Sequence, residues 1–461
     1  MRYLSYKKAF WLYFIIWFLG AGCQKDGVQP MELEGVLTGG STTIHSTGPD
    51  AFTFPLANLN ATGLQKHLQA DGAFAQQFVT APATQFGGLG PLFNQNSCES
   101  CHIRNGRGQV PRFEGDTKSG LLLRLSVPGT GPHGEILPAP GFGGQLQTKA
   151  IFGTEPEGKL SWTEQMEIVT FVDGTSKEIS KRIYSVEEPY TALPGGLMIS
   201  PRNAPPVYGL GLLEAIKEED ILKNADEQDL NGDGISGKPN WVWEVLEEKK
   251  SLGRFGWKAG NPTAAQQSAD AAHNDMGLTS FYFKNESCEG QSNCQGGLSP
   301  EDDVDGETID LFTFYFQALA VPAARGLDLP DVKRGKELFE KANCTACHTP
   351  SFKTGNHPMS ELSNQTIFPY TDMLLHDMGE GLADNRPEFD ANGREWRTAP
   401  LWGIGLNQIV NPNTTFLHDG RAADLEEAIL WHGGEAEKSR DVFKKFSKEE
   451  RDALIEFVKS L

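Results

Sequence analysis

The chain contains the pentapeptides Cys98-Glu-Ser-Cys101-His102 and Cys344-Thr-Ala-Cys347-His348, which share the pattern C-x-x-C-H. Two thiols one helical turn apart can add to the two vinyl groups of one porphyrin, and the next histidine can then bind the iron. A zinc knuckle would need the two motifs to pool their ligands, and a thioredoxin-like redox pair has no use for a histidine in both copies. The sequence therefore predicts two covalently bound c-type haems, with His102 and His348 as iron ligands.

Composition limits the kinds of partner. The 461 residues include 41 lysines and arginines against 61 aspartates and glutamates, which gives a formal net charge of −20. This balance argues against nucleic acid or an anionic membrane surface as a partner and favours a basic electron-transfer protein. An acidic surface would equally serve to keep an exported protein in solution.

The N-terminus has the layout of a secretory signal, with three basic residues, the apolar run Ala9–Gly22 and then Cys23. The residues before Cys23 resemble a bacterial lipobox, although Leu19 stands four positions before the cysteine rather than three. We expect residues 1–22 to be a signal peptide and residues 23–50 a tether. The protein would then be exported to the periplasm, or anchored in the outer membrane through acylated Cys23, and a plain signal peptide is the alternative.

Short alternating runs between the motifs predict strands at Leu121–Val127, Gln165–Val172 and Lys177–Tyr184, and Asp173-Gly174 predicts a tight hairpin between the last two. Apolar residues at helical spacing predict helices at Leu56–Val79, Leu210–Lys223, Ile309–Leu319, Asp331–Asn343 and Ser447–Leu461. In the last of these, Ser447 and Glu450 are spaced as a capping box.

Two further groups of residues suggest local chemistry. Asp229, Asn231 and Asp233 occupy positions 1, 3 and 5 of an EF-hand-type loop, but Asn240 stands where the bidentate glutamate is expected, so calcium and a plain Asp/Asn/Gly turn both remain open. Cys288 and Cys294 lie in one polar loop and, in an oxidising compartment, are expected to form a disulfide, with a free pair or a metal site as alternatives.

The second haem needs another axial ligand, and four histidines follow His348, namely His357, His376, His418 and His432. Helical spacing alone does not choose among them. The motifs Arg397-Thr-Ala-Pro400, Phe416-Leu-His418-Asp-Gly420 and Leu425-Glu-Glu-Ala428 resemble those of the bacterial di-haem cytochrome c peroxidase and MauG superfamily. The chain is most similar to its di-haem oxidoreductase branch, whose members are labelled peroxidases or thiol oxidoreductases, over most of its length after residue 50.

This resemblance implies roles for individual residues. The second ligand of the C-terminal haem falls 14 residues after His418, at His432, where the peroxidases have methionine. A bis-histidine haem held by His348 and His432 should have a lower potential than a histidine-methionine haem. No distal histidine can be matched after His102, so the first haem would be five-coordinate or carry an unidentified sixth ligand.

The family also implies a tryptophan between the haems, and Trp257 precedes Gln267 by the ten residues that the family pattern requires. Trp257 would be the electron bridge, Gln267 would position peroxide, and Asp275 would move a proton during O–O cleavage. Asp275-Met276 resembles the acid-methionine pair of the family but stands two residues earlier in the sequence than the family pattern requires. The family's calcium site corresponds to Asn413–Thr415, which lacks the proline of the pattern.

From these residues and the resemblance we expect a mainly α fold with two cytochrome-c-like haem domains, 51–325 and 326–461, and a β-rich insertion at about 118–200 in the first. The expected function is reduction of hydrogen peroxide or another small oxidant at the His102 haem. Electrons would come from a cytochrome or a small copper protein through the His348/His432 haem. The alternatives are a pure electron-transfer cytochrome, a MauG-like oxidase of a protein side chain, and a calcium-stapled binding lipoprotein without haem.

Overall fold

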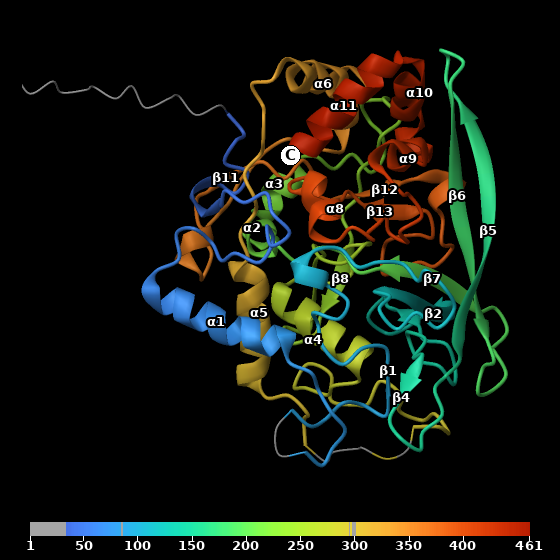
Figure 1. Cartoon of the computed structure of the whole chain (residues 1–461). Helices are drawn as coiled ribbons and strands as arrows, with labels where there is room; N and C mark the ends of the chain where they lie inside the picture. Colours follow the sequence, from blue (N-terminus) through green and yellow to red (C-terminus); the bar gives the residue numbers. More distant parts are fainter. Residues whose placement is uncertain (1–33, 84–85, 295, 297–300) are drawn as a thin grey trace, which may run out of the picture. The chain divides into compact units, whose positions relative to one another are not determined.

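The computed structural model describes residues 34–83, 86–294, 296 and 301–461, in which short helices alternate with short strands (Figure 1). The helices are α1 Ala61–Ala75, α2 Leu210–Glu214, α3 Glu218–Leu222, α4 Ala264–Met276, α5 Gly306–Ala318, α6 Pro330–Lys341, α7 Gly379–Leu382, α8 Asn407–Val410, α9 Leu425–Leu430, α10 Glu437–Lys445 and α11 Lys448–Ser460. The strands are β1 Leu92–Phe93, β2 Leu121–Thr130, β3 Ile136–Leu137, β4 Lys149–Ala150, β5 Lys159–Thr170, β6 Ser176–Glu187, β7 Met198–Asn203, β8 Trp241–Glu244, β9 Lys249–Leu252, β10 Phe352–Lys353, β11 Thr366–Ile367, β12 Leu375–Asp377 and β13 Glu395–Arg397.

The expectation of a mainly α fold is wrong. The chain is 28% helix and 19% strand, and the strands form many small sheets instead of one insertion. The hairpin of β8 and β9 and the antiparallel pairs β10–β11 and β12–β13 lie outside the predicted β region. Each of these strands has only two to four residues, which is too short for side-chain alternation to be recognised in the sequence.

Two β units lie in the predicted β region. Strands β5 and β6 pair in register from Lys159↔Glu187 to Thr170↔Ser176, and Asp173-Gly174 lies in the turn, so the predicted hairpin is confirmed. Figure 1 shows this hairpin as a long two-stranded ribbon that reaches α10. Strand β2 lies between β3 and β7 in a three-stranded sheet, where Leu122 pairs with Arg202 and Arg124 with Ser200.

The predicted helices near the motifs are confirmed with shifted ends. Helix α6 leads to the second motif and packs beside α11, and α1 packs beside α5 (Figure 1). Helix α11 begins with the predicted capping box, in which the Ser447 side chain accepts from the Glu450 backbone and the Glu450 side chain accepts from the Ser447 backbone. The predicted helix at 210–223 is two short helices, α2 and α3.

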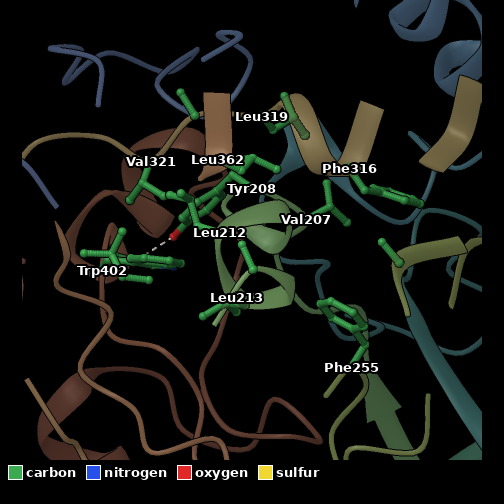
Figure 2. Packing of buried hydrophobic residues seen from close by; sticks show 14 of the residues in the cluster. Val207, Tyr208, Leu212, Leu213, Phe255, Phe316, Leu319, Val321, Leu362 and Trp402 are labelled. Atoms are coloured by element: carbon green, nitrogen blue, oxygen red, sulfur yellow. Dashed lines mark hydrogen bonds between the residues drawn. The ribbon is translucent and has the colours of Figure 1, made fainter. Parts of the chain in front are cut away.

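The largest hydrophobic cluster draws residues from both sides of the predicted domain boundary near 325. Tyr208 and Leu212 pack with Leu362 and Trp402, and the Tyr208 hydroxyl donates to the Trp402 carbonyl oxygen over 2.9 Å (Figure 2). Residues Glu34–Leu461 form one compact unit. The division at 325 remains a prediction, but the core around Tyr208 depends on both segments.

The signal peptide and Cys23 lie outside the described residues. Of the predicted tether, residues 34–50 pack against the rest of the unit, because the buried Thr38 hydroxyl donates to Pro322 and Ile44 pairs with the same residue in an isolated bridge. Cys288 and Cys294 are joined by a disulfide that closes a short loop.

Candidate haem sites

The first motif forms a tight turn. The backbone N–H groups of Cys101 and His102 both donate to the Cys98 carbonyl oxygen, at 3.2 and 3.0 Å, which closes the turn that carries both thiols and the imidazole. Burial, together with the charge of Asp275, raises the pKa of Cys98 to about 12. A redox-active or zinc-binding cysteine has a lowered pKa, so these protonated thiols do not favour a thioredoxin-like pair.

The second motif repeats this arrangement. The His348 N–H donates to the Cys344 carbonyl oxygen over 2.9 Å, and burial raises the pKa of Cys344 to about 12. Within the part of the chain that the structure describes, the groups of three or more metal-ligand atoms comprise only Cys347, Asp372 and His376. The four motif cysteines are therefore not gathered as one zinc site would require.

Three imidazoles are anchored in the same way, through Nδ1 to a backbone carbonyl oxygen. The Nδ1 atoms of His102, His348 and His432 lie 2.7, 2.9 and 2.8 Å from the carbonyl oxygens of Pro205, Tyr370 and Ala428. A carbonyl oxygen only accepts, so each Nδ1 carries the proton and each Nε2 keeps its lone pair. Burial lowers the pKa of His102 and of His348 to about 4, and that of His432 below its ordinary value, so all three are neutral at pH 7. A neutral imidazole anchored through Nδ1 is the form that binds haem iron.

The other histidines after His348 are engaged elsewhere. His376 donates from both ring nitrogens, to Asp372 at 2.8 Å and Glu435 at 2.7 Å; burial would lower its pKa, but these bonds raise it well above its ordinary value. His357 is hydrogen bonded to Glu214, and His418 lies flat against Trp396 with ring centroids 3.6 Å apart. His432, at the end of α9, is therefore the one of the four that presents a free Nε2 anchored through Nδ1.

One cavity connects both motifs. Its lining includes Cys101 and His102 of the first motif, Cys344, Cys347 and His348 of the second, and also His432 and Trp257. The cavity wall is mostly apolar elsewhere, with Phe255, Phe316, Phe339, Leu401 and Leu454 among its residues. An apolar cavity with thiols and free imidazole nitrogens on its wall fits two porphyrins, each held by its motif.

Trp257 is buried and held from three sides. Its indole N–H donates to the Asn203 carbonyl oxygen over 2.8 Å, its own carbonyl oxygen accepts from the Arg397 N–H over 2.9 Å, and the Arg107 guanidinium lies 5.2 Å from its ring centroid. These contacts fix the ring in the cavity wall. They also link Trp257 to β7, which precedes Pro205 at the His102 site, and to β13.

Helix α4 presents a row of polar residues to the cavity. Gln267, Asp270 and Asp275 all line it, at positions that lie on one helix face. The Asn261 amide donates to Gln267 at 3.3 Å and to Asp270 at 3.2 Å, so these two residues share one partner. Asp275 lies further along the helix, where it accepts from Gln145 over 2.9 Å. Burial raises the pKa of Asp275 to about 6, although the hydrogen bond from Gln145 lowers it.

Asp270 is a cavity residue that the sequence analysis did not identify. It stands one helical turn after Gln267, so helical spacing from the predicted glutamine would have found it. Arg124, Arg202 and Glu388 also line the cavity and were not identified. Arg124 and Arg202 meet through the long-range pairing of β2 with β7, and Glu388, from a later loop, contacts Arg202; no local pattern reveals either relation.

In the Asp229 loop, side-chain oxygens accept hydrogen bonds from N–H groups of the loop's own backbone. Asp229 accepts from the Gly234 N–H, Asn231 from the Asp233 N–H and Asp233 from the Ile235 N–H. The Lys438 ammonium donates to the Asp233 carbonyl oxygen over 2.7 Å. These are the bonds of an Asx-type turn, and calcium at this loop remains a prediction.

No helix among the described residues combines the length and apolar character needed to cross a bilayer. No similar protein was found among curated proteins, and none among solved structures. A family model described as "Di-haem oxidoreductase, putative peroxidase" matches residues 33–461. With both C-x-x-C-H motifs on the wall of one cavity, and with the match spanning nearly the whole chain, the protein belongs to this di-haem oxidoreductase family.

Proposed function

We propose that this member of the family is an exported c-type di-haem enzyme that reduces hydrogen peroxide. The observation that carries the proposal is the shared orientation of His102, His348 and His432, whose Nε2 lone pairs remain free beside the same cavity. One haem would be held by Cys98, Cys101 and His102, and the other by Cys344, Cys347, His348 and His432. When bound, the two haems supply an iron that takes up peroxide and a second redox centre that stores an electron.

The two sites differ in the number of imidazoles available. His348 and His432 line the same cavity, each anchored through Nδ1, which supports a bis-histidine site. Helix α4 adds an amide and two carboxyl groups to the cavity wall, and the charge of Asp275 acts on both cysteines of the first motif. A haem site with a histidine on one side and polar, non-ligating groups on the other leaves room for a small oxidant.

Residues of α4 would have separate roles in peroxide reduction, one in binding peroxide and one in donating a proton. The Gln267 amide can hold a peroxide oxygen by hydrogen bonding, and its geometry is fixed by Asn261. Reduction of peroxide to two waters consumes two protons and two electrons, so the site needs a proton donor. Asp275, with its pKa raised to about 6, is protonated in part at neutral pH and is suited to that role, and Asp270 is a second carboxyl group beside Gln267.

Trp257 would carry electrons between the two halves of the cavity. Its ring lies near Arg107, its indole N–H donates to Asn203 of β7, and its carbonyl oxygen accepts from the Arg397 N–H. The donor would be a basic redox protein, such as a cytochrome or a copper protein, attracted by the net charge of −20. We further propose location in the periplasm or on the outer membrane through Cys23.

The test begins with a pyridine haemochrome assay and mass analysis of the purified protein. Two covalent haems per chain are expected, and one in the variant with both Cys98→Ser and Cys101→Ser. The resting spectrum should contain one high-spin haem that reacts with peroxide, and this component should be absent from the double variant. Two wholly low-spin haems that do not react with peroxide would identify an electron-transfer cytochrome instead. A colourless protein would overturn the proposal altogether.

A further inference from the structure

A cluster of basic side chains lies beside the cavity near the His102 site. Arg202 contacts Glu388 at 2.7 Å, Arg386 contacts Glu388 at 3.0 Å, and Lys258 contacts Asp384 at 2.9 Å. Arg124 is near enough for its charge to act on Glu388. We call Arg124, Arg202, Lys258, Arg386, Asp384 and Glu388 the guanidinium cluster.

The guanidinium cluster has more positive than negative groups. Three arginines and one lysine face two carboxylates, and burial lowers the pKa of Lys258 only to about 8, so it is still protonated at neutral pH. The Lys258 side chain is fully buried, and its three protons are used by Asp384 and the carbonyl oxygens of Arg386 and Asn392. The charge of Arg124 also acts on the Asp275 carboxyl group, so the cluster keeps an excess of one to two positive charges, which calls for further anionic groups.

All three arginines of the guanidinium cluster have an N–H group without an acceptor among the described residues; the Nε of Arg386 is one of them, but Arg386 is not among the residues that line the cavity. The Nε of Arg124 and the Nη2 of Arg202 are buried and make no hydrogen bond, and the Asp384 oxygen nearest to Arg202 Nη2 is 3.7 Å away. Both residues line the cavity. A buried charged donor left without an acceptor is costly, so these N–H groups indicate a missing acceptor on the cavity side.

The sheet connects these two arginines with the segment that anchors His102. The odd-numbered residues Leu121, Leu123 and Leu125 of β2 are in a hydrophobic core, whereas Leu122 and Arg124 lie on the opposite face and line the cavity. Arg202 pairs with Leu122 and precedes by three residues Pro205, whose carbonyl oxygen anchors His102. Three extended residues span about 10 Å, comparable to the reach from the centre of a porphyrin to its carboxylates.

We propose that Arg124 and Arg202 bind the two propionate carboxylates of the His102 haem, an inference that rests on the proposed function. The motif cysteines hold the vinyl edge of the porphyrin, and the propionates occupy the two other pyrroles. Two carboxylates would offset the excess positive charge of the guanidinium cluster and supply acceptors for the free N–H groups of Arg124 and Arg202 on the cavity wall. The cations of the cluster would also favour the reduced iron, because it carries less positive charge than the oxidised iron.

Arg124→Gln and Arg202→Gln test this assignment in the full-length holoprotein, with Arg182→Gln on β6 as the matched control because Arg182 instead donates to the Pro111 carbonyl oxygen. Resonance Raman spectra should show the propionate bending bands of the high-spin haem shifted in both test variants, and unchanged in Arg182→Gln. The midpoint potential of this haem should fall, because removal of a nearby cation favours the oxidised iron. Arg124→Lys, which keeps the charge but not the planar fork, should restore most of the potential but not the Raman bands.

The outcomes separate the two proposals. Two covalent haems with unchanged propionate bands and potential in both glutamine variants would overturn the assignment of Arg124 and Arg202 while leaving the proposed function intact. Fewer than two covalent haems in the unmodified protein would refute the proposed function itself. If Arg202→Gln does not fold because Glu388 loses its closest partner, Arg124→Gln alone decides, since Arg124 donates only to Gln145 among the described residues.

Discussion

The imidazole of His432 donates from Nδ1 to the carbonyl oxygen of Ala428, 2.8 Å away and one helical turn earlier. This bond uses the carbonyl at the end of α9 to set both the tautomer and the direction of a side chain that lies just beyond the helix. The same device at Pro205 and Tyr370 orients His102 and His348. Backbone carbonyl oxygens therefore fix the tautomer and direction of all three histidines that are the candidate iron ligands.

Replacing His432 by methionine should raise the midpoint potential of the His348 haem, because a thioether donates less strongly to iron than an imidazole. Potentiometric titration followed by absorbance measures the change, and near-infrared magnetic circular dichroism identifies the ligand pair. His133→Gln is the control, since His133 is exposed and stacks on Trp243. Unchanged potentials of both haems in His432→Met would exclude His432 as a ligand.

Gln267→Leu and Asp270→Asn should each lower kcat/KM for peroxide by about 100-fold, the usual loss when one positioned polar group is removed from a reacting centre. Both residues line the cavity and accept from the Asn261 amide; Gln267→Leu removes one of these acceptors, whereas Asp270→Asn keeps an acceptor and removes the carboxyl group. Steady-state kinetics with a reduced cytochrome donor gives the measurement. Asp310→Asn on the exposed face of α5 should retain full activity, and equal losses in all three variants would point to a general structural effect.

Asp275 should impose a pH dependence on peroxide turnover. Burial raises its pKa to about 6, so the carboxyl group is protonated below this pH and can donate a proton. The rate should therefore rise as the pH falls through about 6. In Asp275→Asn this limb should disappear, because an amide does not titrate. A limb that persists unchanged in the variant would show that another group supplies the proton.

Trp257→Phe should keep both haems but slow the transfer of electrons between them by about tenfold or more. Phenylalanine fills most of the space but lacks the indole N–H that donates to Asn203, and it is harder to oxidise. Stopped-flow absorbance after mixing half-reduced protein with peroxide follows the transfer. Trp162→Phe on the β5–β6 hairpin is the control. Equal transfer rates in Trp257→Phe and the unmodified protein would remove Trp257 from the path.

Glu157→Gln should stabilise the protein at alkaline pH. Burial raises the pKa of the folded Glu157 to about 8 from its ordinary 4.5, so the folded state holds a proton that the unfolded state releases. Stability due to this group is therefore present below about pH 4.5 and is lost as the pH rises to about 8. Glutamine, which can still accept from the Gln147 N–H, removes this loss and should add up to about 4 kcal/mol at pH 8.

Thermal unfolding of the holoprotein between pH 5 and 9 measures this effect. The curves of the two proteins should converge at the acid end and separate toward the alkaline end. Glu155→Gln, an exposed neighbour, should follow the unmodified protein throughout. Parallel curves for Glu157→Gln and the unmodified protein would contradict the expectation.

The sequence predicted the parts of this molecule whose signals are local. The capping box of α11, the amphipathic α6 before Cys344 and the Asp173-Gly174 turn all lie within a few residues of the pattern that reveals them. The fold class was misjudged because strands such as β12 and β13 consist of three residues each and are recognisable only from their partner. Pairing between distant segments leaves no periodic signal in either one.

The same limit applies to the candidate sites. The motif residues could be found because covalent haem attachment requires a fixed spacing, whereas Arg202 and Arg124 meet only after β2 pairs with β7. His432 could be chosen over His376 from the resemblance, but the physical reason is the pair of carboxylates, Asp372 and Glu435, that occupies both nitrogens of His376. Asp270 could have been predicted from the sequence, since it lies one helical turn from Gln267.

The β5–β6 hairpin comes from the first half of the chain but is fastened to the helices around His432. Lys177 contacts Asp424 at 2.5 Å, the Ser180 N–H donates to Glu427 over 2.9 Å, and Arg451 of α11 contacts Asp173 at 2.9 Å. The two motif-bearing halves are therefore not interchangeable modules. In a chimera that takes residues 326–461 from another family member, the helices would lack the hairpin residues with which their own contacts evolved. Recombination between relatives should therefore succeed only when the β5–β6 hairpin and residues 326–461 are exchanged together.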